Sequence, residues 1–434
     1  MSSISEEVIL FENKNQLWNL KIQDVFIWEL IRLDVFLQIQ ELHSSEKFVP
    51  TSSKSQSFRI KIKRFISNLF RSPFLGKKVD EIIFESSRKY KISDNSYADL
   101  YTSFLKDDNF VKNALTIETT FDIDNFDYKK SHIDSLNFIS KLLRSFVKIT
   151  YNSTEIHEIK KLETLLKDNF GLLIDLKETI RTKILHFKSE ELVFHWLLKL
   201  RKPKKVFFIG YNRFSALVSA CKKLNVDSIE VQHGLILKES LIYHFPNVSK
   251  GALNYFPNSF VLWKEFPYNT GELPVCTKNI KYINKSHLTY MVEKFSNIKK
   301  EKKSILIVSQ PMHSTGILDF IKSNLLSLRE YNIYYKIHPM EFNKLGLNDD
   351  LTDLSKFGNI KIIKNEMSIY ELLQKVSFVL GVYSTTLFEA SLFNCEIFVL
   401  DIDSNHYTDS LRDKPNVSFI YPDTNLVDYL ELKK

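Results

Sequence analysis

Two predicted strands in the C-terminal half of the chain end in polar residues whose types suit a phosphate. The string Lys336–Pro339 (KIHP) follows apolar residues that start at 333, and Tyr383–Thr386 (YSTT) follows the apolar run 376–382. Ligands of open α/β sheets bind at the carboxyl ends of the strands, so we expect both strings to line a binding crevice. An imidazole before a proline turn and hydroxyls at a helix start are groups that hold phosphate oxygens.

The candidate nucleotide-binding residues of this half are His338, Pro339, Ser384, Thr385, Thr386 and Glu389. His338 also has a structural interpretation, as a strand-end side chain bonded to a backbone carbonyl. Hydroxyl residues such as Ser384 commonly cap helices without binding any ligand. Glu389, one turn into the predicted helix, either accepts from two ribose hydroxyls or simply favours the positive helix end.

A third constellation, Gln232-His233-Gly234, ends a predicted strand at 227–231. A histidine at such a position can act as a general base that takes a proton from an acceptor hydroxyl. The alternative is a structural histidine in a turn. Strand alternation places Glu230 and Gln232 on one face and His233 on the other, so we expect Glu230 not to orient His233.

The elements around these residues predict an α/β protein with two doubly wound, Rossmann-like domains that face a cleft. Strands alternate with helices from Lys205, and a second series starts at Ser304 after a basic segment, 294–303, that we predict to be the linker. Earlier, 8–45 has a helical apolar stripe, Glu81–Glu85 resembles a first strand, and Ala98–Leu105 a short helix. The predicted domains are a helical and basic N-terminal extension (1–80), an acceptor domain (81–293), a nucleotide-donor domain (304–410) and a C-terminal segment (411–434).

Composition narrows the choice of ligand. The chain has 434 residues and a net charge of +8, which favours anionic partners. It has 10 glycines and no G-x-G-x-x-G or Walker A pattern, so the usual dinucleotide and P-loop sites are excluded. Three widely spaced cysteines fit a reducing cytoplasm. We see no signal peptide and no span long enough to cross a bilayer.

The segment 54–78 mixes eight Lys or Arg with bulky apolar residues and contains no acid. This pattern predicts a peripheral contact with a membrane surface, and the alternative is a connector with a solvated basic face. The basic residues carry no recognised nucleic-acid motif, so we expect no nucleic-acid partner.

A metal site has little support in the sequence. Asp122-Ile-Asp124 and Asp401-Ile-Asp403 have the D-x-D form that binds Mg²⁺ or Mn²⁺ in nucleotide-sugar enzymes, but the form also arises by chance in acidic segments. We therefore expect no required cofactor and no metal, with Mg²⁺ as the alternative.

Together, these motifs resemble those of bacterial GT-B glycosyltransferases of the capsule and lipopolysaccharide type. Lys336–Pro339 resembles the HP motif of sialyltransferases, Kdo transferases and CDP-glycerol polymerases, Tyr383–Thr386 their serine motif, and Val231–Leu235 the QHG strand end of capsule proteins. The resemblance covers roughly 205–410. It departs from the family at Thr385, where a second Ser is usual, and in the acidic base motif of many sialyltransferases, which is not visible here.

The resemblance implies a peripheral enzyme on the cytoplasmic face of the plasma membrane that moves a sugar from a CMP-activated donor to a surface glycan or glycolipid. The sugar would be a sialic-acid-like nonulosonic acid or Kdo. His338, Ser384 and Thr385 would bind the donor phosphate, Glu389 the ribose, and His233 would be the base. Topology alone suggests Glu85, Ser86, Ser87 and Gln232 for the acceptor side. The alternatives are a CDP-polyol phosphotransferase, a UDP-sugar glycosyltransferase and an inactive capsule-assembly protein.

Overall fold

The chain forms two compact units, one ending at Ser286 and the other beginning at His287. A computed structural model describes residues 4–43, 70–93, 96–106, 109–119, 130–264, 269–284, 286–344, 349–402 and 406–433. The predicted membrane segment is therefore described only from Phe70 onward.

Unit 1 contains a seven-stranded sheet in which every neighbouring pair is parallel. Its order is β11 (Ile280–Ile283), β10 (Ser259–Trp263), β9 (Asp227–Val231), β8 (Lys205–Phe208), β3 (Glu81–Phe84), β6 (Ala114–Glu118) and β7 (Ser131–His132). The chain runs outward from β3 in one direction and from β8 in the other. The order reverses between these two strands, and such a point opens a crevice at their carboxyl ends.

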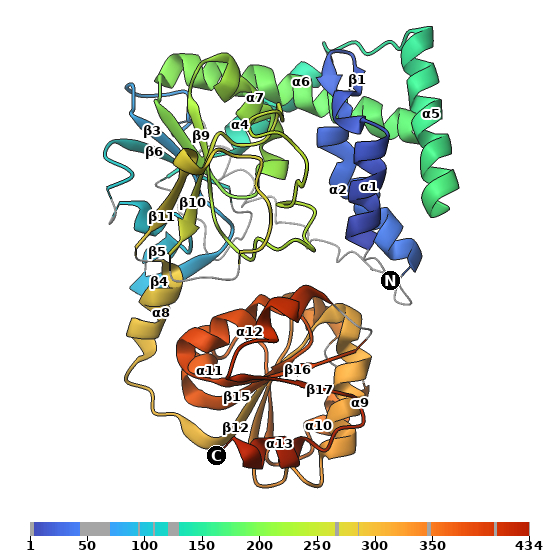
Figure 1. Cartoon of the computed structure of the whole chain (residues 1–434). Helices are drawn as coiled ribbons and strands as arrows, with labels where there is room; N and C mark the ends of the chain where they lie inside the picture. The colour runs from blue at the N-terminus through green and yellow to red at the C-terminus, as the bar shows by residue number, and fades with distance from the viewer. Residues whose placement is uncertain are drawn as a thin grey trace. The chain divides into compact units, whose positions relative to one another are not determined.

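Helices pack around the unit 1 sheet. The longest of them, α6, lies along the sheet (Figure 1). The helices are α1 (Ile4–Lys14), α2 (Ile27–His43), α4 (Asp134–Arg144), α5 (Ser153–Phe170), α6 (Leu176–Arg201) and α7 (Ser215–Lys223). Asn152 and Glu155 form a capping box at the start of α5, and Gly171 ends that helix in the left-handed conformation.

The N-terminal helices belong to the core of unit 1. Buried residues of α1 and α2 share one hydrophobic cluster with α5, α6 and α7. Continuous helix over 8–45 is wrong, because Gln16 is left-handed after α1 and two short strands follow, β1 (Lys21–Ile22) and β2 (Val25–Phe26). Between these strands, Gln23 and Asp24 both have positive φ and make the turn.

Unit 2 contains a six-stranded, fully parallel sheet. Its order is β14 (Ile360–Ile363), β13 (Asn332–Lys336), β12 (Glu301–Val308), β15 (Val376–Gly381), β16 (Glu396–Leu400) and β17 (Val417–Ile420). Numbered along the chain, this order is 3-2-1-4-5-6, which is that of a Rossmann fold, with the reversal between β12 and β15.

Helices lie on both faces of the unit 2 sheet, with α9 and α10 on one side and α11 and α12 on the other (Figure 1). The helices are α8 (His287–Phe295), α9 (Ser314–Asn324), α10 (Asp349–Leu354), α11 (Ile369–Lys375), α12 (Thr385–Ala390) and α13 (Leu426–Leu432). The inner strands are rich in β-branched and aromatic residues and are largely buried on both faces, as a covered parallel sheet requires, whereas the edge strands β14 and β17 are partly exposed.

The two doubly wound α/β sheets confirm the predicted fold class, while some local predictions fail. Ala98–Leu105 is not a helix: β5 (Ser96–Asp99) pairs with β4 (Lys89–Ser93), and a 3₁₀ turn follows. The predicted linker, 294–303, includes the end of α8 and the start of β12. In the part of the chain that the structure describes, no helix is long and apolar enough to span a bilayer.

Candidate functional site

Glu230 and His233 lie together at the carboxyl end of β9, in contrast to the prediction from alternation. The Nδ1 atom of His233 is 3.9 Å from Oε1 of Glu230. Alternation applies only within a strand, and β9 ends at Val231, so the chain has already turned at His233. Glu230 is thus placed to stabilise a protonated His233.

The carboxylate of Glu230 is fully buried and is held by three donors. The backbone N–H groups of Gly210 and Tyr211, which follow β8, donate to it at 3.0 and 3.1 Å. The hydroxyl of Tyr243 donates a short hydrogen bond to Oε1. Burial raises the pKa of Glu230 to about 7, and these hydrogen bonds act in the opposite direction. Near neutral pH, the protonated and ionised forms of Glu230 are therefore both populated.

The side chain of His233 is partly open to solvent, with 35% exposed. Burial lowers its pKa, as do the nearby guanidinium groups of Arg88 and Arg213, while a backbone hydrogen bond with Val231 raises it. Arg88 reaches this region through the hydroxyl of Tyr101 at 3.2 Å, and the Tyr101 and His233 rings lie 6.0 Å apart. His233 is therefore neutral at pH 7 and has a nitrogen that can accept a proton.

Gln232 has an internal role in the turn after β9. Its carbonyl oxygen accepts from the N–H of Trp263 at 2.9 Å, and its amide donates to Asn269 and to Gly234 O at 2.9 Å. These bonds join the ends of β9 and β10 and fix the turn that presents His233.

The other three residues suggested for the acceptor side follow β3, and two of them are engaged within the protein. Glu85 is buried and pairs with Lys130 at 2.8 Å and with Lys89 at 3.4 Å. The Ser86 hydroxyl donates to Asp99 at 2.6 Å. Ser87 is exposed. An acceptor role for these residues stays a prediction, and their contacts also explain them as supports of the β4–β5 hairpin.

In unit 2, the reversal point brings the end of β12 against the end of β15. The side-chain oxygen of Gln310, which follows β12, accepts from the N–H of Tyr383 at 2.8 Å. Gln310 is buried, so this bond fixes the loop that begins the YSTT string. Ser384 then caps α12, since its hydroxyl oxygen accepts from Thr386 N–H at 3.2 Å. The hydroxyl hydrogen of Ser384 still allows this side chain to act as a donor.

His338 follows β13, the neighbour of β12 on its other side, and is half-buried. Its Nδ1 accepts from the N–H of Met340 at 3.3 Å. In the neutral ring the proton then sits on Nε2, which makes that atom a donor. Glu341 fixes the same turn, because its N–H donates to His338 O at 2.8 Å and its carboxylate accepts a short hydrogen bond from Ser309.

The remaining predicted residues of unit 2 differ in accessibility. Thr386 is buried, whereas Thr385 and Glu389 are half-buried and Pro339 is exposed. Thr385 and Glu389 both lie on α12 and are spaced by one helical turn. Donor contacts for all four stay predictions.

No group of three or more His, Cys, Asp or Glu within the described ranges could hold a metal ion. Asp122, Asp124 and Asp403 lie outside those ranges. Asp401 pairs with Arg412 at 3.4 Å. A metal at either D-x-D motif is therefore still only an alternative.

From the sequence alone we missed Gln310, Tyr243 and the two arginines near His233. We also excluded Glu230 as a partner of His233. The sequence does contain a signal for Gln310. This residue belongs to a polar pair that follows a buried strand and precedes a proline, Pro311, and His338 also stands between a strand and a proline. Arg88 had no such signal because it lies far from His233 in sequence, and Tyr243 had none because it lies in a loop without a periodic pattern.

Glu230 should make the stability of unit 1 depend on pH. Because its folded pKa is about 7 against 4.5 for the free group, the folded state binds the extra proton between these values. The free energy of unfolding should therefore fall as pH rises from 4.5 to 7, by up to about 1.4 kcal/mol per pH unit. Glu230→Gln should flatten this slope. All four tryptophans lie in unit 1, so urea unfolding followed by tryptophan fluorescence measures it. Equal slopes in both proteins would contradict the assignment.

Several solved structures are similar to the chain at low identity. UDP-GlcNAc 2-epimerase from Methanocaldococcus jannaschii is 12% identical with a TM-score of 0.46, over 81% of this chain and 91% of that one. A putative UDP-N-acetylglucosamine 2-epimerase from Listeria monocytogenes is 12% identical with a TM-score of 0.47, over 83% and 89%. Acinetobacter baumannii MurG is 10% identical with a TM-score of 0.42, over 82% and 90%. No protein-family model and no curated protein matches the sequence. Likeness at this level assigns no activity or ligand to the chain.

Proposed function

We propose that the chain is a GT-B glycosyltransferase that moves a sugar from a CMP-activated donor to a bacterial surface glycan. The observation that supports it best is the reversal point of unit 2. There Gln310 fixes the loop before the hydroxyl-capped start of α12, and His338 follows the adjacent strand. A nucleotide phosphate is the ligand that these donors suit, and the resemblance of the two strings to the HP and serine motifs favours cytidine.

The proposed donor site uses charge-stabilising groups rather than a metal. His338 Nε2–H and the hydroxyls of Ser384 and Thr385 would donate to the phosphate oxygens, while Glu389 would accept from the ribose. As the glycosidic bond breaks, negative charge develops on the departing CMP, and donors fixed in advance stabilise it. The turn held by Glu341 and Ser309 keeps His338 in position for this task.

The proposed base is His233, with Glu230 as its positioning residue. His233 would take the proton of the acceptor hydroxyl as that oxygen attacks the anomeric carbon. Arg88 and Arg213 disfavour the resulting imidazolium. An anionic group bound beside them would cancel their charge and raise the basicity of His233, so proton removal would be coupled to substrate binding.

A nucleotide screen tests the donor. CMP and CDP should stabilise unit 2 in scanning calorimetry, by about 2.7 kcal/mol at a hundredfold excess over the dissociation constant. UDP, GDP and ADP should do so much less. His338→Ala should abolish the CMP effect, whereas His157→Ala, an exposed position on α5, should retain it.

Stabilisation by UDP but not by CMP or CDP would replace the cytidine donor with a uridine one. If CDP-glycerol is consumed and a CMP-activated sugar is not, the phosphotransferase alternative holds. Absence of any nucleotide effect would favour an inactive assembly protein.

A further inference from the structure

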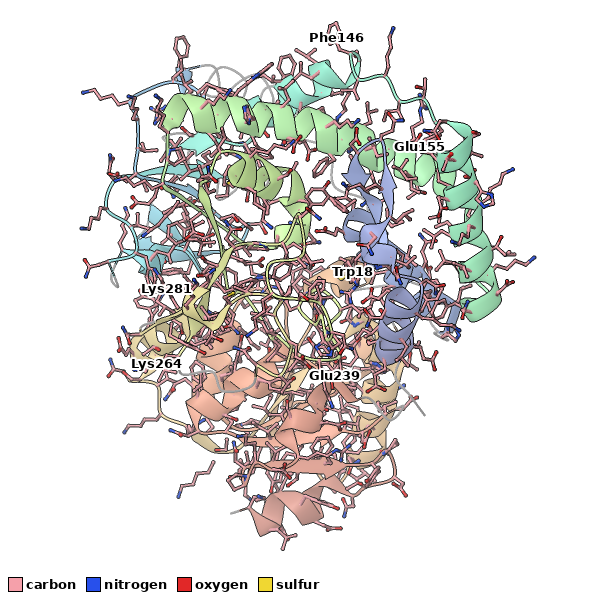
Figure 2. The ribbon with its side chains drawn as sticks, turned by 45° about the horizontal axis from the view of Figure 1, so that its top comes forward. Trp18, Phe146, Glu155, Glu239, Lys264 and Lys281 are labelled. Atoms are coloured by element: carbon pink, nitrogen blue, oxygen red, sulfur yellow. The ribbon has the colours of Figure 1, made fainter. Side chains whose placement is uncertain are left out.

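Two stripes of large apolar side chains are exposed on neighbouring helices of unit 1. On α4 and just beyond its end, the stripe has a four-residue spacing and consists of Phe138, Leu142 and Phe146. On α6 the same spacing gives Leu192, Trp196 and Leu200. Phe146 is 80% exposed, and Figure 2 shows it pointing away from the ribbon at the edge of the unit. Such a spacing places each set on one side of its helix.

The two helices pack against each other, so their stripes belong to one surface. The hydroxyls of Ser140 on α4 and Ser189 on α6 lie 3.0 Å apart, and Arg144 pairs with Glu190 at 3.5 Å. Two residues of the α6 stripe, Trp196 and Leu200, line a groove of about 470 Å³ together with Ile139 of α4, Lys199 and Phe74. We call the exposed apolar residues of α4 and α6 and this groove the α4–α6 face.

The described end of the basic segment completes the α4–α6 face. Arg201 on α6 donates to Leu75 O at 2.8 Å and accepts, through its own carbonyl, from Val79 N–H at 3.0 Å. These bonds hold the chain so that Phe74 enters the groove while Phe70 and Leu75 remain exposed. The sequence pattern that predicts a membrane contact thus continues onto a folded surface.

The charged residues around this face are mainly positive. The stretches 70–80, 134–148 and 188–204 contain eleven Lys or Arg and four Asp or Glu. Three of the acids are paired with a Lys or Arg: Glu190 with Arg144, Asp80 with Lys204 at 3.1 Å, and Glu191 with Lys223 at 2.7 Å. Contact between two copies of this face would oppose like charges, which disfavours self-association. A partner that offers both negative charge and an apolar interior suits it better.

We propose that the α4–α6 face docks on the surface of an anionic lipid bilayer. The Phe, Leu and Trp side chains would enter the boundary between headgroups and acyl chains, and the surrounding Lys and Arg would contact lipid phosphates. Trp196 suits this boundary because an indole ring favours the interface region. The proposal is independent of the donor nucleotide and of the base.

Vesicle binding by the full chain tests the proposal. Co-sedimentation uses phosphatidylcholine vesicles with about 30% phosphatidylglycerol, in parallel with pure phosphatidylcholine. We expect binding to the anionic vesicles only, and at least a tenfold loss of affinity in Phe138→Glu/Phe146→Glu, which leaves 54–78 intact. Leu10→Glu is the matched control, because Leu10 is 68% exposed on α1 of the same unit. It should bind like the parent.

A second readout locates the contact. Trp196 is 43% exposed, whereas Trp28 and Trp263 are buried, so a blue shift of tryptophan emission on adding vesicles should disappear in Trp196→Phe. Equal binding by the double variant and the parent would overturn the proposal, as would a failure of the parent to bind. Self-association that the double variant abolishes, without lipid binding, would also overturn it by identifying a protein partner. None of these results depends on CMP binding.

Discussion

Replacing Arg32 by Met should destabilise unit 1 by about 3–5 kcal/mol. Arg32 and Glu12 form a two-pronged ion pair, with Nε–Oε2 and Nη2–Oε1 distances of 2.7 Å, and both side chains are buried. Without Arg32, the Glu12 carboxylate would keep the indole N–H of Trp28 at 2.8 Å as a donor but would have lost its buried counter-charge. Urea unfolding followed by tryptophan fluorescence gives the free energy of unfolding.

The exposed ion pair of Asp34 and Lys183 is the matched control, since it also anchors α2 to another helix, in this case α6 instead of α1. Both side chains are more than a third exposed, so Lys183→Met should cost less than about 1 kcal/mol. The double variant Glu12→Leu/Arg32→Met should recover much of the lost stability, because it leaves no buried charge unpaired. A cost for Arg32→Met as small as that of the control would show that burial of the pair is unimportant.

The same arginine connects the N-terminal helices to the candidate site. It donates to Leu241 O and, at 3.2 Å, to His244 O, on either side of Tyr243. Nearby, Glu29 accepts from the backbone of Asn254 at 2.8 Å, later in the same loop. Since Tyr243 bonds Glu230, we expect loosening of α2 to weaken the positioning of His233 as well as the stability of unit 1.

Several strands were predictable because they carry the nearly continuous apolar runs that a covered parallel sheet requires. The run 376–381 matches β15, and the parallel order of the strands follows from their alternation with helices. The two edge strands of the unit 1 sheet were not predictable. β7 has two residues and β11 has an exposed centre, so neither leaves a periodic apolar signal.

The candidate site was predictable only where its residues follow such strands directly. His338, Ser384 and His233 could be found because each lies just after the end of a strand that the sequence predicts. The contact of Glu230 with His233 could not, because it depends on where the strand ends and on the turn that Gln232 stabilises through Trp263 N–H. Tyr243 lies in a loop that Arg32 fixes from a helix 209 residues away in sequence. Such long-range contacts leave no local pattern.

Replacing His233 by Ala should lower turnover by at least about 100-fold while leaving nucleotide binding intact. The proposed base acts on the acceptor, whereas the donor nucleotide is held by residues of unit 2, so the two effects should separate. Turnover is measured as acceptor-dependent release of CMP from a CMP-activated sugar, and CMP binding by calorimetry. Because the pKa of His233 lies below its ordinary value, the base is deprotonated at neutrality, and its own protonation should lower the rate only as pH drops through that lowered pKa.

Glu230 distinguishes a base from a histidine that merely shapes the turn. If Glu230 stabilises the imidazolium, it does so only when it is ionised, 3.9 Å from His233. Glu230→Gln should therefore reduce kcat mainly above pH 7 and remove the rise in rate that accompanies ionisation of Glu230. A structural role predicts an unshifted pH profile. His157→Ala, at an exposed position on α5, should match the parent in rate and profile. Full turnover in His233→Ala would show that another group removes the proton.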